Sequence, residues 1–204
     1  MGYTGSQGGV VVKERPILFQ SDMVNAILEG RKTQTRRIVK PTKDRNGSGC
    51  QLAPCEIAGE VNSGDYSFCS YGKPGDRLWV REAFRNRRVD NSPGDVVYRA
   101  DHPGESTVPG SYGRSWKPSI HMPRWASRIT LEIVSARVER LQDISEADAK
   151  AEGVIGEKEA AEAGLEWHDK PRRAFRFLWQ PINGPDSWDA NPWVWVVEFR
   201  RIEP

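Results

Sequence analysis

The stretch SRITLEIVSARVER, residues 127–140, decides the fold because it contains the clearest long strand in the chain. Ile129, Leu131 and Ile133 occupy every second position, and polar side chains stand between them. Successive side chains of a strand point to opposite faces, so this spacing places the three apolar residues on one face. The stretch therefore predicts a strand with one buried face.

Four helices are predicted around this strand. The clearest lies in DISEADAKAEG, where Ser145 is a suitable N-cap, Asp148 follows three residues later and Gly153 ends the helix. An earlier helix is expected to have Ser21 as its N-cap and to end at Gly30. The other two are predicted at residues 157–163 and 172–180, the last of them ended by Pro181.

The fold class follows from the order of these helices and the other predicted strands. The strands are RLWVRE at 77–82, VVYRA at 96–100 and PWVWVVEFRRI at 192–202. One face of the last strand holds Trp193, Trp195, Val197 and Phe199. Strands outnumber the helices that could connect parallel strands, which argues against a doubly wound sheet. We therefore predict an α+β fold, a small and mostly antiparallel β-barrel with peripheral helices.

Domain organisation follows from length and composition. A chain of 204 residues with 37% hydrophobic residues and eight tryptophans is expected to form one domain with one core, here residues 15–204. The glycine-rich start predicts a disordered leader at 1–14, and residues 42–73, rich in Gly, Ser, Asn and Pro, predict a long loop insertion. The leader lacks an apolar signal core and no long apolar run exists, so we expect a cytoplasmic protein without a membrane span.

The charges are unevenly distributed although the net charge is only +2. Basic residues gather in 31–45, 81–88 and 114–128, whereas 139–169 is mainly acidic. Such asymmetry lets a nearly neutral protein present a positive face to an anion. The stretch GRKTQTRRIVK, residues 30–40, is the strongest candidate for such a site, because it contains five cations and no acid.

The three cysteines, Cys50, Cys55 and Cys69, raise the question of a zinc site. An odd number of cysteines argues against a disulfide framework. Structural zinc takes four ligands, and these three have no fourth candidate nearby, since His102 is remote in sequence. We therefore predict neither a bound metal nor a cofactor.

Several ordered motifs resemble the ASCH domain, a PUA-like β-barrel. They are GRKTQTRR, PGDRLWVRE, MPRWASRITLEI, ISEADAKAEGV and INGPDSWDANPWVWVVEFRRI. The likeness is greatest to long ASCH proteins of tailed phages and prophages, and it covers most of residues 16–202 except 42–72. It implies contact with RNA or a modified nucleoside, and the host cytoplasm as the location of a phage-encoded protein. We expect no obvious protein partner.

One branch of the family, the small bacterial N4-acetylcytidine amidohydrolases, has a catalytic Lys, Thr and Glu. Matching the motifs places these residues at Lys32, Thr35 and Glu152, in a considerably longer chain. In one division of roles, Thr35 is the nucleophile, Lys32 takes its proton and Glu152 protonates the leaving amine. In the other, Glu152 activates water and Lys32 stabilises the oxyanion. The sequence leaves both open.

Structural roles also explain these three residues. Lys32 follows a predicted helix C-terminus, where a cation stabilises the helix by about 0.3–1 kcal/mol. Thr35 is a good strand former, and Glu152 is one acid among many in an acidic segment. In a regular strand Lys32 and Thr35 would point to opposite faces, so a shared site requires a turn or bulge between them.

Further substrate-binding candidates are Arg31, Thr33, Trp79, Arg81, Glu82, Arg124 and Arg128. Trp79 and Arg81 share a predicted strand face, where a base could stack on the indole and a phosphate could bind the guanidinium. The alternative is a core tryptophan beside an edge ion pair. A second basic cluster surrounds Trp125, for which a core position is the favoured alternative. The hypotheses are therefore an N4-acylcytidine amidohydrolase, a non-catalytic RNA-binding module and, third, a ribonuclease.

Overall fold

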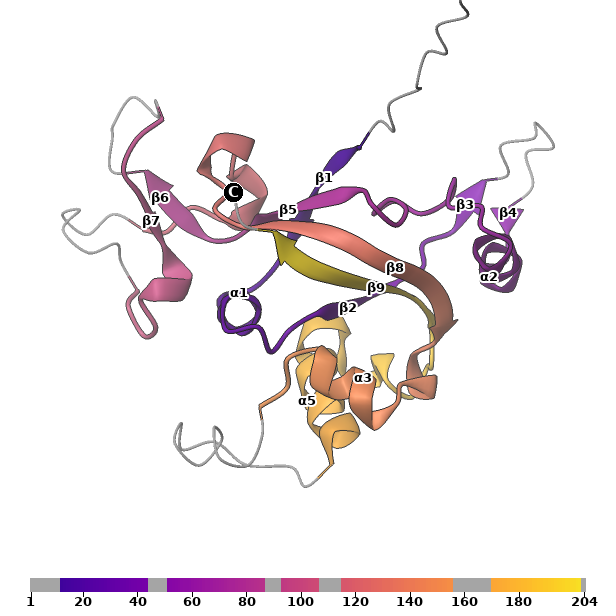
Figure 1. Cartoon of the computed structure of the whole chain (residues 1–204). Helices are drawn as coiled ribbons and strands as arrows, with labels where there is room; N and C mark the ends of the chain where they lie inside the picture. The colour runs from indigo at the N-terminus through magenta and orange to yellow at the C-terminus, as the bar shows by residue number, and fades with distance from the viewer. Residues whose placement is uncertain (1–11, 44–50, 87–92, 107–114, 156–169, 203–204) are drawn as a thin grey trace, which may run out of the picture.

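The computed structural model describes residues 12–43, 51–86, 93–106, 115–155 and 170–202 (Figure 1). Its main sheet has the strand order β1-β5-β8-β9-β2. These strands are β1 (Glu14–Leu18), β5 (Arg77–Arg81), β8 (Thr130–Arg140), β9 (Trp193–Ile202) and β2 (Gln34–Ile38). Only β1 and β5 pair in parallel within this sheet. The predicted α+β class with a mostly antiparallel sheet is therefore confirmed.

Smaller elements surround the main sheet. Two short ribbons pair β3 (Thr42–Lys43) with β4 (Gln51–Leu52), and β6 (Phe84–Asn86) with β7 (Val96–Tyr98). The α-helices among the described residues are α1 (Ser21–Leu28), α2 (Pro54–Asn62), α3 (Glu146–Ala151) and α5 (Pro171–Asn183). In Figure 1, α3 and α5 lie together below β9 and β2, and the β6–β7 ribbon lies at the opposite end from α2. None of the described helices is long and apolar enough to cross a membrane.

Strand β8 confirms the long strand predicted at 127–140, although it begins at Thr130. The register shifts between Ile133 and Ser135, which leaves Val134 unpaired and 52% exposed. Because one extra residue reverses the alternation, Leu131 before the bulge and Ala136 after it both reach the same core. The bulge therefore lets one long strand keep a single apolar face.

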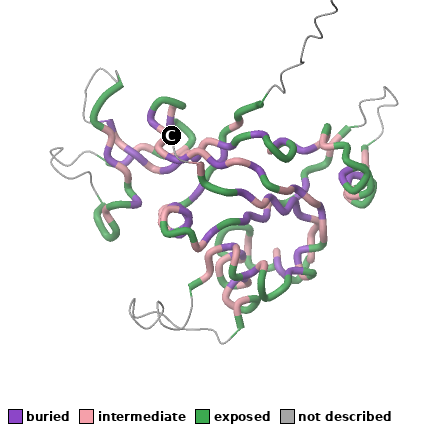
Figure 2. Tube along the Cα trace, in the orientation of Figure 1, coloured by how far each residue is buried: buried purple, intermediate pink, exposed green. Residues whose placement is uncertain are grey.

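Strand β9 is buried on both faces. Trp195, Val197 and Phe199 belong to the main core, as the alternation predicted. Val194 and Val196 point the other way, into a second cluster that contains Phe175 and Trp179 of α5 and Leu141. The run from Val194 to Val197 is thus apolar throughout because core packs against each side (Figure 2).

The insertion predicted as a loop at 42–73 contains an ordered helix, so the loop prediction is wrong for residues 54–62. Pro54 stands at the first helical position, and Glu56 Oε2 accepts a hydrogen bond from the Ala53 N–H at 2.7 Å. Ile57 and Val61, one turn apart, are buried in the main core. The composition of the surrounding residues concealed this pair.

Other boundaries also differ from prediction. The N-cap of α1 is Gln20, and Ser21 is the first helical residue. Pro181 lies inside α5 and does not end it. The helix continues to Asn183, and the Gly184 N–H donates to the Gln180 carbonyl at 2.8 Å. Strand β1, which was not predicted, begins at the last residue of the expected leader. Residues 1–11 and the helix expected at 157–163 lie outside the described residues.

The two edge strands of the main sheet approach each other through a side chain. Arg37 of β2 donates a hydrogen bond from Nη2 to the Leu18 carbonyl of β1 at 2.8 Å. The guanidinium of Arg37 also lies over the ring of Phe19, 5.2 Å from its centroid. Within the described strands no backbone pairing joins β1 to β2, and the PUA-like barrel stays a prediction.

The packing of α2 predicts that Ile57→Ala lowers the free energy of unfolding by about 2–5 kcal/mol, the usual cost of such a cavity. Ile57 is 1% exposed, whereas Ile120 is 57% exposed and provides the same substitution at the surface. Chemical denaturation of both variants measures the difference. Equal and small losses for Ile57→Ala and Ile120→Ala would show that α2 is not part of the core.

Candidate functional site

Lys32 and Glu152 are brought together by a short backbone bridge between the segments that follow α1 and α3. The chain leaves α1 at Gly30, whose φ of 76° is in the left-handed region that glycine adopts easily. The Lys32 N–H then donates to the Ala26 carbonyl and the Thr33 N–H to the Ala151 carbonyl, each at 2.9 Å. Lys32 therefore lies outside the regular strand β2, as a shared site required.

The two side chains form an enclosed ion pair. Lys32 Nζ lies 2.8 Å from Glu152 Oε2, 2.7 Å from the Gln34 carbonyl oxygen and 2.9 Å from the Glu152 carbonyl oxygen. An ammonium group has three hydrogens, so each has an acceptor. The side chains of Lys32 and Glu152 are only 1% and 3% exposed.

The pKa of Lys32 is lowered from its ordinary value, and burial is the largest cause. Glu152 acts in the opposite direction through its charge and its hydrogen bond. The nearby charges of Arg37 and Arg36 lower the pKa further.

Glu152 has a second cationic partner in Arg36, whose side chain is fully buried. Arg36 Nη1 donates to Glu152 Oε1 at 3.2 Å, and Nη2 donates to Glu139 Oε1 at 2.6 Å. Asp148 lies 3.4 Å from the same guanidinium, and Arg137 of β8 binds both Glu139 and Asp148. The resulting ion network connects β2, β8 and α3.

Thr35 occupies the other face of β2. It lies opposite Val197 in the β2–β9 register, and Val197 belongs to the main core. Its hydroxyl is buried, and Oγ1 has no hydrogen-bond partner among the described residues. The structure thus brings Lys32 to Glu152, whereas no hydrogen bond joins Thr35 to either of them in the part of the chain described.

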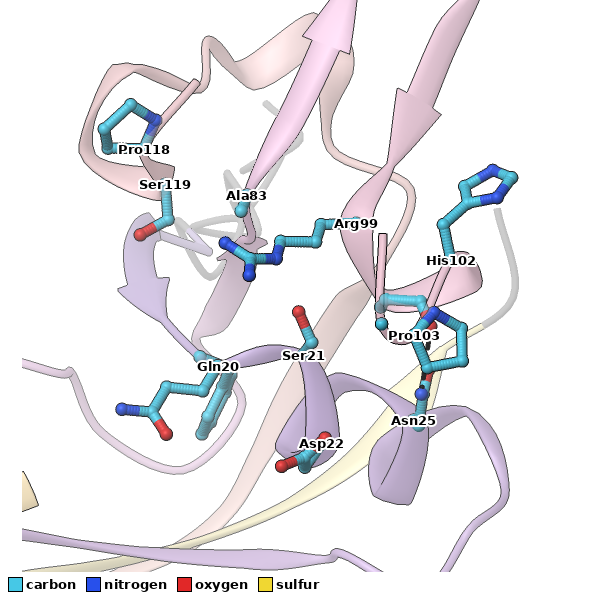
Figure 3. Close-up of a pocket in the computed structure, with 13 residues that line it drawn as sticks. Gln20, Ser21, Asp22, Asn25, Ala83, Arg99, His102, Pro103, Pro118 and Ser119 are labelled. Atoms are coloured by element: carbon cyan, nitrogen blue, oxygen red, sulfur yellow. Dashed lines mark hydrogen bonds between the residues drawn. The ribbon is translucent and has the colours of Figure 1, made fainter. Parts of the chain in front are cut away.

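Phe19 links this region to a cavity. Lys32 Nζ lies 5.7 Å from the centroid of the Phe19 ring. Phe19 also lines a pocket of about 490 Å³ at the beginning of α1, whose other walls include Arg99 and Ser119 (Figure 3). Lys32, Thr35 and Glu152 do not themselves line this pocket in the described structure. Sequence reasoning missed the pocket because its walls come from the ends of separate elements.

Glu82 and Arg128, both predicted to bind substrate, bind each other. Arg128 Nε and Nη2 donate to the two carboxylate oxygens of Glu82 at 2.9 and 3.1 Å. The same guanidinium contacts both carboxylate oxygens of Asp101 at 2.8 Å and lies over the Tyr98 ring. Burial raises the pKa of Glu82, although Arg128 opposes this shift. The contacts between Glu82, Arg128 and Asp101 therefore explain the positions of these side chains without a bound substrate.

Trp79 has arginines at two sides. The guanidinium carbons of Arg81 and Arg124 lie 5.3 and 5.9 Å from its ring centroid. Trp79 and Arg81 therefore share a face, as predicted, and this face is opposite the core residues of β5. Trp125 is 42% exposed, so the core position favoured for it is wrong.

The remaining candidates are Arg31 and Thr33. Arg31 donates to the Glu29 carboxylate and, from Nη1, to the Gly153 carbonyl at 3.0 Å. Thr33 is exposed, and its backbone carbonyl accepts a hydrogen bond from the Phe199 N–H. Both residues therefore stabilise the backbone around Lys32.

No group of three or more His, Cys, Asp or Glu side chains is placed to hold a metal ion within the described ranges. Cys55 is exposed and Cys69 is buried, and Cys50 lies outside those ranges. Comparison of the chain with protein-family models, curated proteins and solved structures found no match. The ASCH resemblance therefore stays a prediction.

The packing around Lys32 predicts that Gly153→Ala destabilises the fold by more than the strain of an alanine at positive φ. A Cβ at Gly153 would lie 2.8 Å from Lys32 Cβ and 3.0 Å from Ala26 Cβ. Gly30 has a similar positive φ, but a Cβ there meets nothing within 4 Å. We expect Gly153→Ala to lose about 1–3 kcal/mol of unfolding free energy beyond the loss in Gly30→Ala, measured by chemical denaturation. Equal losses would contradict the close packing of Lys32 on Gly153.

Proposed function

We propose that this protein is an amidohydrolase that removes the acyl group from an N4-acylated cytidine-type nucleoside. The Lys32–Glu152 contact carries the proposal, because it joins residues 120 positions apart that the ASCH resemblance selected. Enclosure of this pair and the lowered pKa of Lys32 are typical of functional groups, although structural ion networks share these properties. The hydrogen bond from Arg37 to Leu18 also supports a PUA-like closure of the sheet.

The hydrogen bonds favour one division of roles. Three acceptors around Lys32 Nζ support the ammonium form, and contacts with Lys32 and Arg36 support an ionised Glu152. Glu152 is then the base that takes a proton from water as the water oxygen attacks the acyl carbon. Lys32 stabilises the negative oxygen of the tetrahedral intermediate.

The reaction is completed when the bond between the acyl carbon and N4 breaks. Glu152 returns its proton to N4, which leaves as the exocyclic amine of cytidine, and the acyl group leaves as a carboxylic acid. The hydroxyl of Thr35 is buried and has no partner in the described structure, so in this mechanism it donates a hydrogen bond to substrate only after a rearrangement exposes it. In this proposal a substrate that enters by the pocket approaches Lys32 past Phe19, which lines the pocket and has its ring beneath Lys32 Nζ.

A non-catalytic module for RNA or modified nucleic acid is the second candidate. Every hydrogen of the Lys32 ammonium already has an acceptor, as expected if the pair is structural. Trp79 with Arg81 and Arg124 provides an aromatic and basic surface on which a base could stack. A ribonuclease is a third and weaker candidate, and it would be recognised by cleavage of the RNA chain.

The hydrolase proposal predicts that Thr35→Val folds normally and loses about 10²–10³-fold of the turnover of N4-acetylcytidine. The substitution removes a hydroxyl that has no hydrogen-bond partner, so stability is expected to be retained. Thr42→Val, in the β3–β4 ribbon, is the matched control and should keep full activity. Chromatographic conversion to cytidine measures all three proteins. Absence of turnover in folded wild type would overturn the proposal.

The binding candidate predicts RNA affinity that falls steeply with salt and depends on Trp79. We expect Trp79→Ala to weaken RNA binding by about 1–3 kcal/mol, the value of one base–aromatic stack. Trp125→Ala is the control because Trp125 is exposed nearby but has no arginine over its ring among the described contacts. Fluorescence anisotropy at several salt concentrations measures both variants. Affinity that is independent of salt and of Trp79 would exclude this surface.

A further inference from the structure

The pocket at the beginning of α1 is a second candidate site, distinct from the Lys32–Glu152 pair. It has a volume of about 490 Å³, and α1, the segment 99–104 and the turn at Pro118 form its walls. Asn25 of α1 donates a hydrogen bond to the Ala100 carbonyl at 3.0 Å. This bond holds two walls of the pocket together, so the cavity is part of the fold.

The pocket is lined by Arg99, whose guanidinium makes no hydrogen bond or ion pair with the described residues. Arg99 is exposed. Figure 3 shows this side chain extending across the pocket, which Ser21 and Ser119 also line. Three residues with hydrogen-bond donors, each from a different segment, thus line the same pocket.

Backbone groups add to these donors. The Val24 N–H donates to the Gln20 carbonyl at 2.9 Å, so the N–H groups that precede it in α1 have no acceptor within the helix. Gln20, the N-cap, provides no side-chain hydrogen bond to them. The positive end of the α1 dipole therefore lies at this wall of the pocket.

The other polar residues of the pocket do not oppose an anion at Arg99. Asp22 supplies the only carboxylate among the described lining residues, and in Figure 3 it lies on the far side of the first turn of α1 from Arg99. The His102 ring points away from the cavity and stacks on Trp116, with ring centroids 6.0 Å apart. Among the described lining side chains, one carboxylate therefore stands against the guanidinium of Arg99 and the hydroxyl groups of Ser21 and Ser119.

We propose that this pocket binds a phosphate group and that the natural substrate is a nucleotide or a nucleotide within RNA. A planar guanidinium, two hydroxyl groups and a helix N-terminus match the several oxygens of a phosphate. The volume exceeds that of a phosphate and is typical of a pocket for a small ligand. The identity of the base rests on the proposed function, in which the nucleoside extends from Arg99 past Phe19 toward Lys32.

Calorimetric titration with cytidine, the cytidine monophosphates and inorganic phosphate tests this site. We expect a monophosphate to bind wild type at least about tenfold more tightly than cytidine, and inorganic phosphate to compete with it. Arg99→Gln should abolish the preference and Ser21→Ala should reduce it. Arg173→Gln is the matched control, since Arg173 is an exposed arginine on α5, outside the pocket lining. A phosphate titration of wild type followed by NMR should shift the amide signals of residues 21–23.

Equal affinities for cytidine and its monophosphates would overturn the phosphate site, as would equal effects of Arg99→Gln and Arg173→Gln. Absence of binding by both the monophosphates and inorganic phosphate would do the same. Turnover of free N4-acetylcytidine tests the hydrolase separately, because this substrate has no phosphate. A phosphate preference without turnover of either N4-acetylcytidine or its monophosphate therefore rejects only the hydrolase. Turnover without a phosphate preference rejects only the site at Arg99.

Discussion

The buried carboxylate of Glu152 is the constraint on which the arrangement of the chain depends. A carboxylate removed from water requires compensating charge, and here Lys32 and Arg36 supply it. Both cations come from the segment after α1, whereas Glu152 follows α3. Their pairing therefore holds β2 against the α3 layer while β9 packs on the other edge of β2. Removing one partner would leave a charge buried without compensation, which is more costly than never having buried the pair.

Chemistry and stability make opposite demands on this region. The contacts that place Lys32 beside Glu152 also occupy every hydrogen of the ammonium and exclude solvent from the pair. Among the described residues of this region, the Thr35 hydroxyl and Nε of Arg36 are buried without a hydrogen-bond partner. A hydrolase would have to exchange some of these internal hydrogen bonds for bonds to its substrate. Phe19 lines the pocket, and its ring lies near Lys32 Nζ. Movement of this one side chain is therefore the smallest rearrangement that could begin to replace internal hydrogen bonds with bonds to substrate.

Sequence reasoning succeeded where one local pattern determines the structure. Alternation identified β8 and β9, and the Ser145 cap and Gly153 identified α3. It failed for α2, because only Ile57 and Val61 mark its buried face within a stretch of loop-forming residues. The pairing of Lys32 with Glu152 came from a resemblance, and no local pattern indicates a contact across 120 residues. The partners of Arg128 were likewise hidden, since they come from different segments.

The bulge at Val134 has a consequence for how much change strand β8 tolerates. Beyond the bulge, Val138 faces the main core, whereas Glu139 faces the opposite side and binds Arg36. Deleting Val134 would bring the far half of the strand out of phase, so that carboxylate and guanidinium groups would turn into the apolar interior. Replacing Val134 is therefore a minor change at the surface. Removing it would exchange the buried and the opposite face in the half of β8 that follows the bulge. At this position the number of residues matters more than their identity.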